Sequence, residues 1–246
     1  MSSTESGSGG PRSAGRTGGP AVSSLAPGPS AVQRLYRQRF SPRDRQRKEE
    51  VWRVIVQDFL QRWIRPEDRV LDVGCGHGEF LNHVRCARRV GVDLNPDAAL
   101  ALRDGIEFHA GDVRDLSFLP DGSMDVVFTS NLMEHLPSKA DVERMLREAR
   151  RALRPGGHLI ALGPNMRFIP GVYWDFWDHL IPITDRSLIE LLVDLEFEPV
   201  DCHPKFLPYT TRSAIPKAPW LVRLYLKVPL AWRILGGQFL IRARKP

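Results

Sequence analysis

A run of closely spaced glycines follows the apolar segment 69–73, and it is the first place where the sequence indicates chemistry. The glycines are Gly74, Gly76 and Gly78. Glycines at this spacing let the backbone turn tightly and approach a ligand without an intervening Cβ atom. A dinucleotide-binding loop would need a glycine where Glu79 stands, and that carboxylate disfavours a pyrophosphate. Asp72, just before the glycines, suits a ligand with a positive ammonium group. For the glycine run itself, the alternative is a structural tight turn that binds no ligand.

Acidic residues also follow the next two apolar runs. Asp93 comes directly after 90–92 and about 20 positions beyond the glycines, where an acidic residue is placed to bind the two hydroxyls of a ribose. The alternative is an N-cap for a helix that begins near Pro96. Asp112, preceded by the small residue Gly111, follows the third run. It predicts either a contact with an adenine amino group or an ordinary turn.

A polar segment follows the fourth apolar run, 125–128. It contains Ser130 and Asn131, and then Glu134 and His135. The glutamate or the histidine can act as a general base, and with a further group the pair can hold a divalent metal ion. A structural role is the alternative for the histidine. Because no complete ligand set is identifiable in the sequence, no metal is predicted.

Apolar runs alternate with amphipathic segments along most of the chain. The expected strands cover 69–73, 90–92, 106–108, 125–128, 158–162, 197–203 and 238–243. The expected helices cover about 44–64, 78–86, 97–103, 139–153 and 185–195, the last capped by Thr184 or Asp185. This alternation indicates an α/β fold with a doubly wound, mostly parallel, seven-stranded sheet and helices on both faces. Ligands of such sheets bind beyond the carboxyl ends of the strands, where the residues above stand.

Five segments, in order, resemble the motifs of the class I methyltransferases that use S-adenosylmethionine. They are Val70–Gly78, Val90–Asp97, Gly111–Asp112, Ser130–Leu136 and the Leu-x-Pro-Gly-Gly segment Leu153–Gly157. The resemblance implies a Rossmann-like fold and S-adenosylmethionine as the cofactor. The whole-chain layout also resembles methyltransferases of bacterial sugar and polysaccharide biosynthesis. The Glu-His pair is similar to that of quinone-biosynthesis O-methyltransferases.

The same resemblance implies a role for each matching residue. Near the methionine part of the cofactor it places Asp72, Gly74, Gly76, Gly78, Ser130 and Asn131. Near the adenosine part it places Asp93 on the ribose hydroxyls, Leu94 against the adenine, and Asp112 on the adenine amine, with Gly111 and Val113 alongside.

The segment 164–183, after the fifth expected strand, is a long insertion dense in aromatic residues. We expect it to form an acceptor lid that suits a sugar or another flat polar acceptor, and a lid that only packs is the alternative. A hydroxyl acceptor must lose a proton, which His or Glu side chains typically remove. His135 is the first candidate base, with Glu134 beside it, and His179, supported by Asp178, is the second.

The leading hypothesis is O-methylation of a small-molecule, sugar or lipid-linked acceptor. The alternatives are an RNA or protein methyltransferase and a non-catalytic, methyltransferase-like partner subunit. Residues 49–202 carry 17 basic and 27 acidic residues, and no Asn-Pro-Pro-Tyr-like motif follows the fourth strand. A nucleic-acid partner is therefore not expected.

The two ends of the chain differ in composition from its body. Residues 1–30 are rich in Gly, Ser and Pro and are expected to be a disordered tail. The methyltransferase domain is expected over 31–246, with N-terminal helices (31–66), a cofactor-binding core (67–163), the acceptor lid (164–183) and a C-terminal part (184–246). Residues 203–246 carry nine Lys or Arg and no Asp or Glu.

The composition also predicts a location. Three scattered cysteines are too few for a disulfide framework, the N-terminus has no apolar signal region, and no apolar stretch reaches roughly 18 residues. We therefore expect a cytoplasmic protein. A basic amphipathic insertion over 205–236 has the composition of a helix in a membrane interface, which predicts peripheral contact with the inner face of a membrane. Packing of this insertion on the sheet is the alternative.

Overall fold

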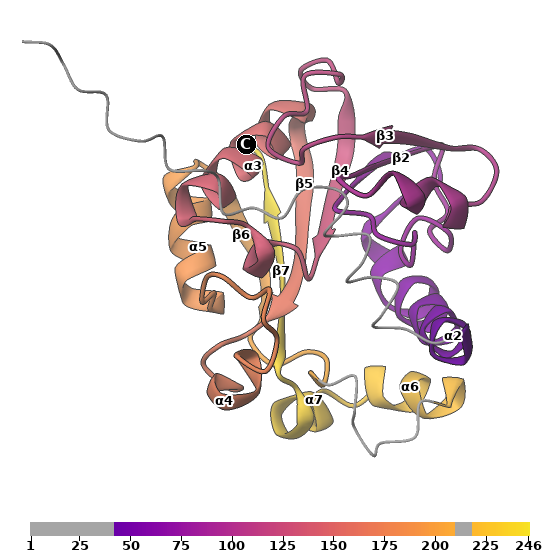
Figure 1. Ribbon diagram of the computed structural model, residues 1–246, viewed down its shortest axis with the longest axis vertical. Helices are drawn as coiled ribbons and strands as arrows, with labels where there is room; N and C mark the ends of the chain where they lie inside the picture. The colour runs from indigo at the N-terminus through magenta and orange to yellow at the C-terminus, as the bar shows by residue number, and fades with distance from the viewer. Residues whose placement is uncertain (1–41, 210–217) are drawn as a thin grey trace, which may run out of the picture.

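A computed structural model describes residues 42–209 and 218–246, and a single sheet runs through its centre (Figure 1). The strands are β1 Arg69–Val73, β2 Arg88–Asp93, β3 Ile106–Ala110, β4 Met124–Ser130, β5 Leu153–Pro164, β6 Glu198–His203 and β7 Gln238–Arg244. They lie in the order β3-β2-β1-β4-β5-β7-β6. Strands β1 to β5 are parallel, and β7 is antiparallel to both β5 and β6. The predicted seven-stranded, mostly parallel sheet is confirmed.

The direction of the strand order reverses between β1 and β4. The chain moves outward from β1 to β3 and then returns to place β4 on the other side of β1. At this point Val73 of β1 is in register with Thr129 of β4. The carboxyl ends of two such strands leave a crevice between their diverging loops, and this is where open α/β sheets bind ligands.

Helices cover both faces of the sheet. The α-helices are α2 Pro42–Asp58, α3 Lys139–Ala152, α4 Pro170–Tyr173, α5 Asp185–Asp194, α6 Pro219–Leu226 and α7 Pro229–Leu235. The 3₁₀ helices are η1 Leu60–Trp63, η2 Pro96–Ala101 and η3 Met133–His135. One buried core joins α3 and α5 to the sheet, and the other joins α2, α6 and α7 to its opposite face.

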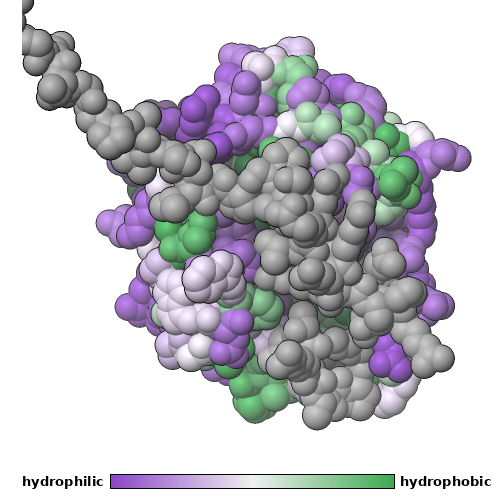
Figure 2. Space-filling view, in the orientation of Figure 1, coloured by the Kyte–Doolittle hydropathy of each residue, from purple (hydrophilic) through white to green (hydrophobic). Residues whose placement is uncertain are grey.

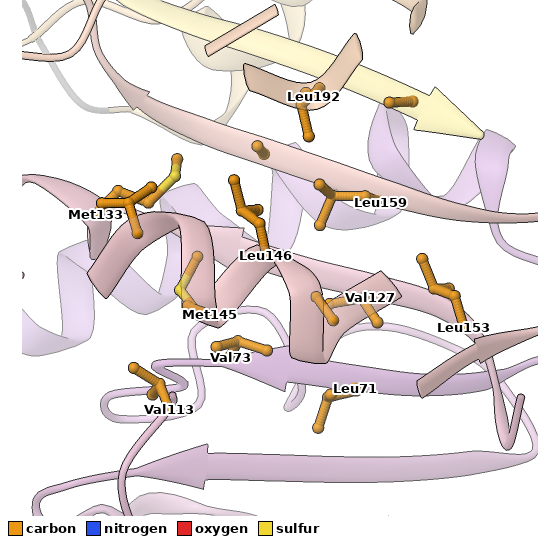
Figure 3. Close-up of a cluster of buried hydrophobic side chains, with 14 of the residues drawn as sticks. Leu71, Val73, Val113, Val127, Met133, Met145, Leu146, Leu153, Leu159 and Leu192 are labelled. Atoms are coloured by element: carbon orange, nitrogen blue, oxygen red, sulfur yellow. The ribbon is translucent and has the colours of Figure 1, made fainter. Parts of the chain in front are cut away.

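The core on the α3 side shows how the sequence pattern becomes packing. Figure 3 shows Met145 and Leu146 of α3 directed toward the sheet, close to Val127 of β4 and Leu159 of β5. Each of these side chains is almost completely buried. Burial of one such side chain contributes roughly 1.5–3 kcal/mol, so this face holds α3 on the sheet.

The helix caps follow from the sequence. The Ser138 side chain accepts a hydrogen bond from the backbone N–H of Asp141 at 3.2 Å and starts α3. Thr184 caps α5, because its side chain accepts from the Ser187 N–H at 3.0 Å while the Ser187 hydroxyl accepts from the Thr184 N–H. Of the two expected caps for this helix, Thr184 is the one found.

Two predicted helices are wrong in type. Residues 78–83 form successive turns, whose hydrogen bonds mix spans of three and four residues, and residues 84–86 are irregular. Gly76 and Gly78 have positive φ, and the Asn82 side chain donates to the carbonyls of His77 and Ala101, so local side-chain bonds compete with a regular helix. The segment predicted over 97–103 is the shorter 3₁₀ helix η2.

Other boundaries move by a few residues. The first predicted helix divides into α2 and η1, and β5 begins five residues earlier than expected, at Leu153. The predicted tail over 1–30 and residues 31–41 lie outside the described residues, as do residues 210–217 of the basic insertion. Within the residues that the structure does describe, no helix combines the length and the apolar character needed to cross a membrane.

The lid and the two C-terminal helices gather at the carboxyl end of β5. Pro164, the last residue of β5, pairs with Gln238, which follows α7 closely. A Cβ atom at Gly237 would meet Ile169 of the lid at 2.8 Å and Tyr209 at 3.0 Å. Figure 1 shows the arrowhead of β5 pointing toward the end of the molecule where α4, α6 and α7 lie.

Candidate functional site

The glycine loop after β1 has the backbone that its residues predict. Gly74, Gly76 and Gly78 have φ values of 76°, 52° and 75°, a region that L side chains rarely adopt. The N–H groups of Gly74 and Cys75 both donate to the carbonyl of Val92, at 2.9 and 3.1 Å. The loop is therefore fixed to the end of β2, beside the second predicted motif.

Asp93 joins the first two motifs by hydrogen bonds. One carboxylate oxygen accepts from the N–H of Gly76 at 2.8 Å, and the other accepts from the N–H of Asn95 at 2.8 Å. The cap of η2 is Asn95, whose side chain accepts from the Asp97 N–H at 3.0 Å. The capping role considered for Asp93 therefore belongs to Asn95, and the carboxylate of Asp93 lies at the loop. Leu94 is half-buried in the same turn.

Two buried carboxylates, Asp72 and Asp93, and the half-buried carboxylate of Glu79 surround the glycine loop. Burial raises the pKa of Asp72 well above its ordinary value, and the negative charges of Glu79 and Asp93 raise it further. Burial also raises the pKa of Asp93, although the N–H groups of Asn95 and Gly76 act in the opposite direction. Burial would raise the pKa of Glu79 as well, but Lys48 at 2.6 Å outweighs it and lowers that pKa. The excess of acidic groups suits a cationic ligand.

The third predicted motif is held by an arginine. The guanidinium of Arg114 donates to both carboxylate oxygens of Asp112 and also reaches Asp141 of α3. The hydrogen bonds from Arg114 lower the pKa of Asp112. Gly111 donates its N–H to the carbonyl of Asp93 at 3.0 Å, which ties this turn to the second motif. Val113 is buried in the core on the α3 side (Figure 3).

The loop after β4 lies against the glycine loop. A Cβ atom at Gly74 would stand 2.8 Å from the Leu132 side chain, so the two loops are in close contact. Ser130 ends β4, and Asn131 has a φ of 49°, a left-handed conformation that asparagine tolerates better than most residues. The Asn131 N–H donates to the carbonyl of Leu162 at 3.0 Å. The short helix η3, which carries Glu134 and His135, follows directly after this turn.

The structure brings both candidate histidines together. The rings of His135 and His179 lie 4.9 Å apart between centroids, at an interplanar angle of 71°. Glu134 is fully buried beside them, and burial raises the pKa of its carboxyl group. Asp178 lies against His135, with its backbone oxygen 2.9 Å and a carboxylate oxygen 3.3 Å from Nδ1. Asp178, which the sequence predicts as a support for His179, thus contacts His135.

Sequence reasoning did not find Tyr209 or Tyr173. The Tyr209 hydroxyl lies 3.5 Å from Nε2 of His179, and the ring of Tyr173 packs edge-on against His179 at 4.6 Å. Tyr173 was visible only as one aromatic residue of the lid, and Tyr209 lies in a segment with no motif. Both contacts depend on how the lid folds back, and no local pattern encodes that.

The comparisons with known proteins agree with this geometry. Residues 71–161, from β1 to β5, match the family model described as the methyltransferase domain. Over 157 residues the chain is 32% identical to a demethylmenaquinone methyltransferase of Symbiobacterium thermophilum, covering 56% of this chain and 61% of that protein. Over 109 residues it is 38% identical to a fatty-acid O-methyltransferase of Mycolicibacterium smegmatis, covering 41% of this chain and 38% of that protein.

The fold has close counterparts among solved structures. A SAM-dependent methyltransferase from Archaeoglobus fulgidus matches with a TM-score of 0.58 at 20% identity, over 80% of this chain and 94% of that chain. Residues 71–161 therefore match the methyltransferase domain, and the fold is that of an S-adenosylmethionine-dependent methyltransferase, as the sequence predicts. The matched region spans 61% and 38% of the lengths of the two curated relatives, less than two thirds of each.

Proposed function

We propose that the chain transfers the methyl group of S-adenosylmethionine to an oxygen atom of a small or lipid-linked acceptor. The observation that carries this proposal is the contact between the acid-lined glycine loop and the loop that bears Glu134 and His135. An acceptor oxygen forms a bond to the methyl carbon while the carbon–sulfur bond breaks. The electron pair of that bond stays on sulfur and leaves S-adenosylhomocysteine, and the hydroxyl proton departs.

The enzyme must align three atoms and exclude water. Orientation of this kind contributes on the order of 7–11 kcal/mol to catalysis. The lid closes over η3 through its backbone, because Leu180 donates its N–H to the carbonyl of Glu134 at 2.8 Å. His135, Glu134 and His179 remain our candidates for handling the acceptor proton, since they lie together beyond the carboxyl end of β4.

The exposed side chains of the lid, α6 and α7 support an acceptor of lipid character. Trp177 of the lid is 95% exposed, Trp220 of α6 is 66% exposed and Ile234 of α7 is 69% exposed. Further exposed apolar residues in these segments are Val172, Trp174, Leu180, Leu224, Leu230 and Leu235. Figure 2 shows hydrophobic surface at the lower end of the molecule, where Figure 1 places α7. Apolar surface at this density on one end of a protein typically marks an interaction site.

Basic groups lie beside this apolar end. A cavity of about 520 Å³ next to α6 is lined by Asp58, Phe59, Arg62, Arg223, Leu226 and Lys227. Three of these side chains are cationic and one is acidic, and the acidic one, Asp58, pairs with Arg223 at 2.8 Å. Anionic headgroups attract basic residues with about 1 kcal/mol each near the surface. Peripheral contact with an anionic membrane therefore belongs to the proposal.

Two relatives support an acceptor with apolar parts. One is named for fatty-acid O-methylation and the other for demethylmenaquinone methylation. Because the match to each covers only part of that protein's length, these names support the class of acceptor and no particular compound. The sugar acceptor considered from the sequence has no separate support from the relatives.

A transfer assay distinguishes the proposal from its alternatives. The chain is incubated with S-adenosylmethionine radiolabelled on the methyl group and an extract separated into lipid, small-molecule, RNA and protein fractions. We expect label in the lipid or small-molecule fraction, and none with the Gly76→Arg variant. Label in RNA or protein would replace the proposed acceptor. Label in no fraction, from protein that binds the cofactor, would indicate a non-catalytic partner subunit.

A further inference from the structure

Glu134, His135 and His179 form a compact group of potential metal ligands. One ligand atom from each residue lies within 4.8 Å of the other two. Glu134 and His135 come from η3 and His179 comes from the lid, 44 residues later in the chain than His135. The backbone bond from Leu180 N–H to the Glu134 carbonyl holds these two segments together. The group is therefore a product of the fold, not of a local motif.

The ring of His135 is turned so that one nitrogen can bind a cation. Its Nδ1 lies 2.9 Å from the backbone oxygen of Asp178 and 3.3 Å from the Asp178 carboxylate. Both of these oxygens accept hydrogen bonds, so Nδ1 carries the ring proton. Nε2 then presents its lone pair, and it lies 4.0 Å from a carboxylate oxygen of Glu134. A metal-binding histidine commonly donates its other ring N–H to a carboxylate or carbonyl in this way.

The second histidine is held by its neighbours. The ring of Phe176 stacks on His179 with centroids 5.0 Å apart, and Tyr173 contacts it edge-on at 4.6 Å. The Tyr209 hydroxyl lies 3.5 Å from its Nε2. His179 and Glu134 are both buried, whereas the His135 side chain is 29% exposed. The group thus has two fixed, buried members and one side that is open to an acceptor.

From this arrangement we propose that Glu134, His135 and His179 bind one divalent transition-metal ion, with zinc as the best match. Two imidazoles and one carboxylate are a ligand set of catalytic zinc sites, which keep a fourth position open. Zinc bonds of ~2.0–2.1 Å in a tetrahedron set ligand atoms about 3.3 Å apart. The longest separation must therefore close by about 1.5 Å, which side-chain rotation can supply.

The role of the ion rests on the proposed function. An acceptor oxygen in the open position would be fixed beside the cofactor, and its hydroxyl proton would become more acidic because the ion stabilises the alkoxide. The proton would then leave to water, and the oxygen lone pair would attack the methyl carbon as described above. His135 and His179 would thus handle the acceptor proton through the ion that they hold, and loss of either ligand would lower turnover.

Metal binding can be measured without any turnover. The full chain, first freed of metal with a chelator, is titrated with Zn²⁺ by calorimetry. We expect one equivalent to bind. Glu134→Gln and His179→Ala should weaken the affinity by more than about 100-fold, and Asp178→Asn by the roughly 10–100-fold that loss of an orienting partner costs. His109→Ala is the matched control, since its ring stacks on Phe118 outside the group, and it should bind zinc like the parent chain.

X-ray absorption of the zinc-loaded parent chain tests the ligands even if a variant does not fold. The spectrum should contain nitrogen and oxygen neighbours with imidazole features and no sulfur. The proposal would be overturned if the parent chain failed to bind one equivalent of zinc, or if its spectrum contained sulfur neighbours. It would also be overturned if folded Glu134→Gln and His179→Ala bound zinc as tightly as the parent chain. Binding of S-adenosylhomocysteine is measured in the same samples, so that loss of the metal site and loss of the methyltransferase function are distinguished.

Discussion

Asp72 is a buried acid whose position favours binding over stability. Burial and the neighbouring Glu79 and Asp93 raise its pKa, which means that the folded chain resists its ionisation. A carboxyl group with a raised pKa stabilises the fold at low pH, and this contribution is lost as the pH rises above its unfolded value of ~3.9. S-adenosylmethionine carries an ammonium and a sulfonium group, and positive charge at this place would offset the cost of ionising Asp72.

Asp72→Asn should therefore change the stability of the chain and its affinity for the cofactor in opposite directions. The uncharged side chain should raise the free energy of unfolding of the cofactor-free chain by roughly 0.5–2 kcal/mol at neutral pH, as is common when a functional residue is neutralised. It should also weaken the affinity for S-adenosylmethionine. Thermal unfolding with and without the cofactor measures both effects. A variant that is less stable and binds the cofactor normally would contradict this role.

His135 and His179 are predicted to matter for turnover much more than for cofactor affinity. A group that handles the acceptor proton commonly contributes roughly 10²–10⁴-fold, so His135→Ala should lower kcat by that order with little change in cofactor binding. His179→Ala tests the lid histidine in the same assay, and His109→Ala is the control. If only His179→Ala loses activity, the lid alone carries this step. If neither does, the acceptor group needs no proton removal.

At the scale of elements, a half-buried carboxylate links three strands. Asp125 at the start of β4 accepts hydrogen bonds from Arg69 of β1 and Arg154 of β5. Burial by itself would raise the pKa of Asp125, but these hydrogen bonds outweigh it and hold the pKa well below its ordinary value. A lowered pKa stabilises the fold above the unfolded value of ~3.9, and the stabilisation is lost as the pH falls toward the folded value.

Asp125→Asn should lower the free energy of unfolding at neutral pH by roughly 0.5–1 kcal/mol, because Arg69 and Arg154 lose a charged acceptor while solvent screens their partly exposed side chains. The difference between the parent and the variant should narrow as the pH is lowered from neutral to about pH 3. Urea unfolding at both pH values measures it. If the parent and the variant had the same free energy of unfolding at neutral pH, or if their difference did not change with pH, Asp125 would not link the strands in this way.

The amphipathic end formed by the lid, α6 and α7 carries the membrane part of the proposal. Replacing Trp220, Arg223 and Lys227 together by Ser should reduce sedimentation with anionic vesicles at low salt. Neutral vesicles should bind little, and high salt should release the parent chain, because exposed charges are screened. The control replaces Leu100, which is 87% exposed on η2, and Lys139 by Ser. Unchanged vesicle binding of the triple variant would leave α6 as an ordinary part of the fold.

The sequence predicts the strands better than the segments between them. Val126–Phe128 is a continuous apolar run, and Val70–Val73 is interrupted only by Asp72. Short runs of this kind are typical of a strand covered on both faces, and both are strands in the structure. The segment 78–86 lacks such a signal. Its glycines and Asn82 form local hydrogen bonds that the spacing of apolar residues does not reveal, so successive turns replace the expected helix.

The site was predictable where the residues follow a strand directly. Asp93 and the glycines belong to this group, because the topology alone places them at one edge. The contact of His179 with His135 was not predictable, since the lid between them has no periodic pattern and its path depends on the backbone bond between Leu180 and Glu134. The pairing of Asp112 with Arg114 was also missed, although the two residues are neighbours in sequence.

At the scale of the whole molecule, charge is divided between the ends and the body. Residues 49–202 hold an excess of acidic residues, while residues 203–246 hold nine basic residues and no acidic ones. The acid-lined glycine loop belongs to this body, and the basic residues Arg62, Arg223 and Lys227 line the cavity next to α6. The acidic body would attract a cationic cofactor, and the basic C-terminal part would attract an anionic surface that carries the acceptor.

The central claim, that the glycine loop and its carboxylates bind S-adenosylmethionine, is tested most directly by calorimetric titration of the full chain with S-adenosylhomocysteine. We expect one equivalent to bind, and no heat from NAD. Gly76→Arg should abolish binding, because Gly76 has a φ of 52°, which L side chains rarely adopt, and its N–H bond to Asp93 depends on that backbone conformation. Gly171→Arg, placed where a Cβ meets nothing within 4 Å, should bind like the parent. A folded parent chain that gives no heat with either adenosyl ligand would contradict the account.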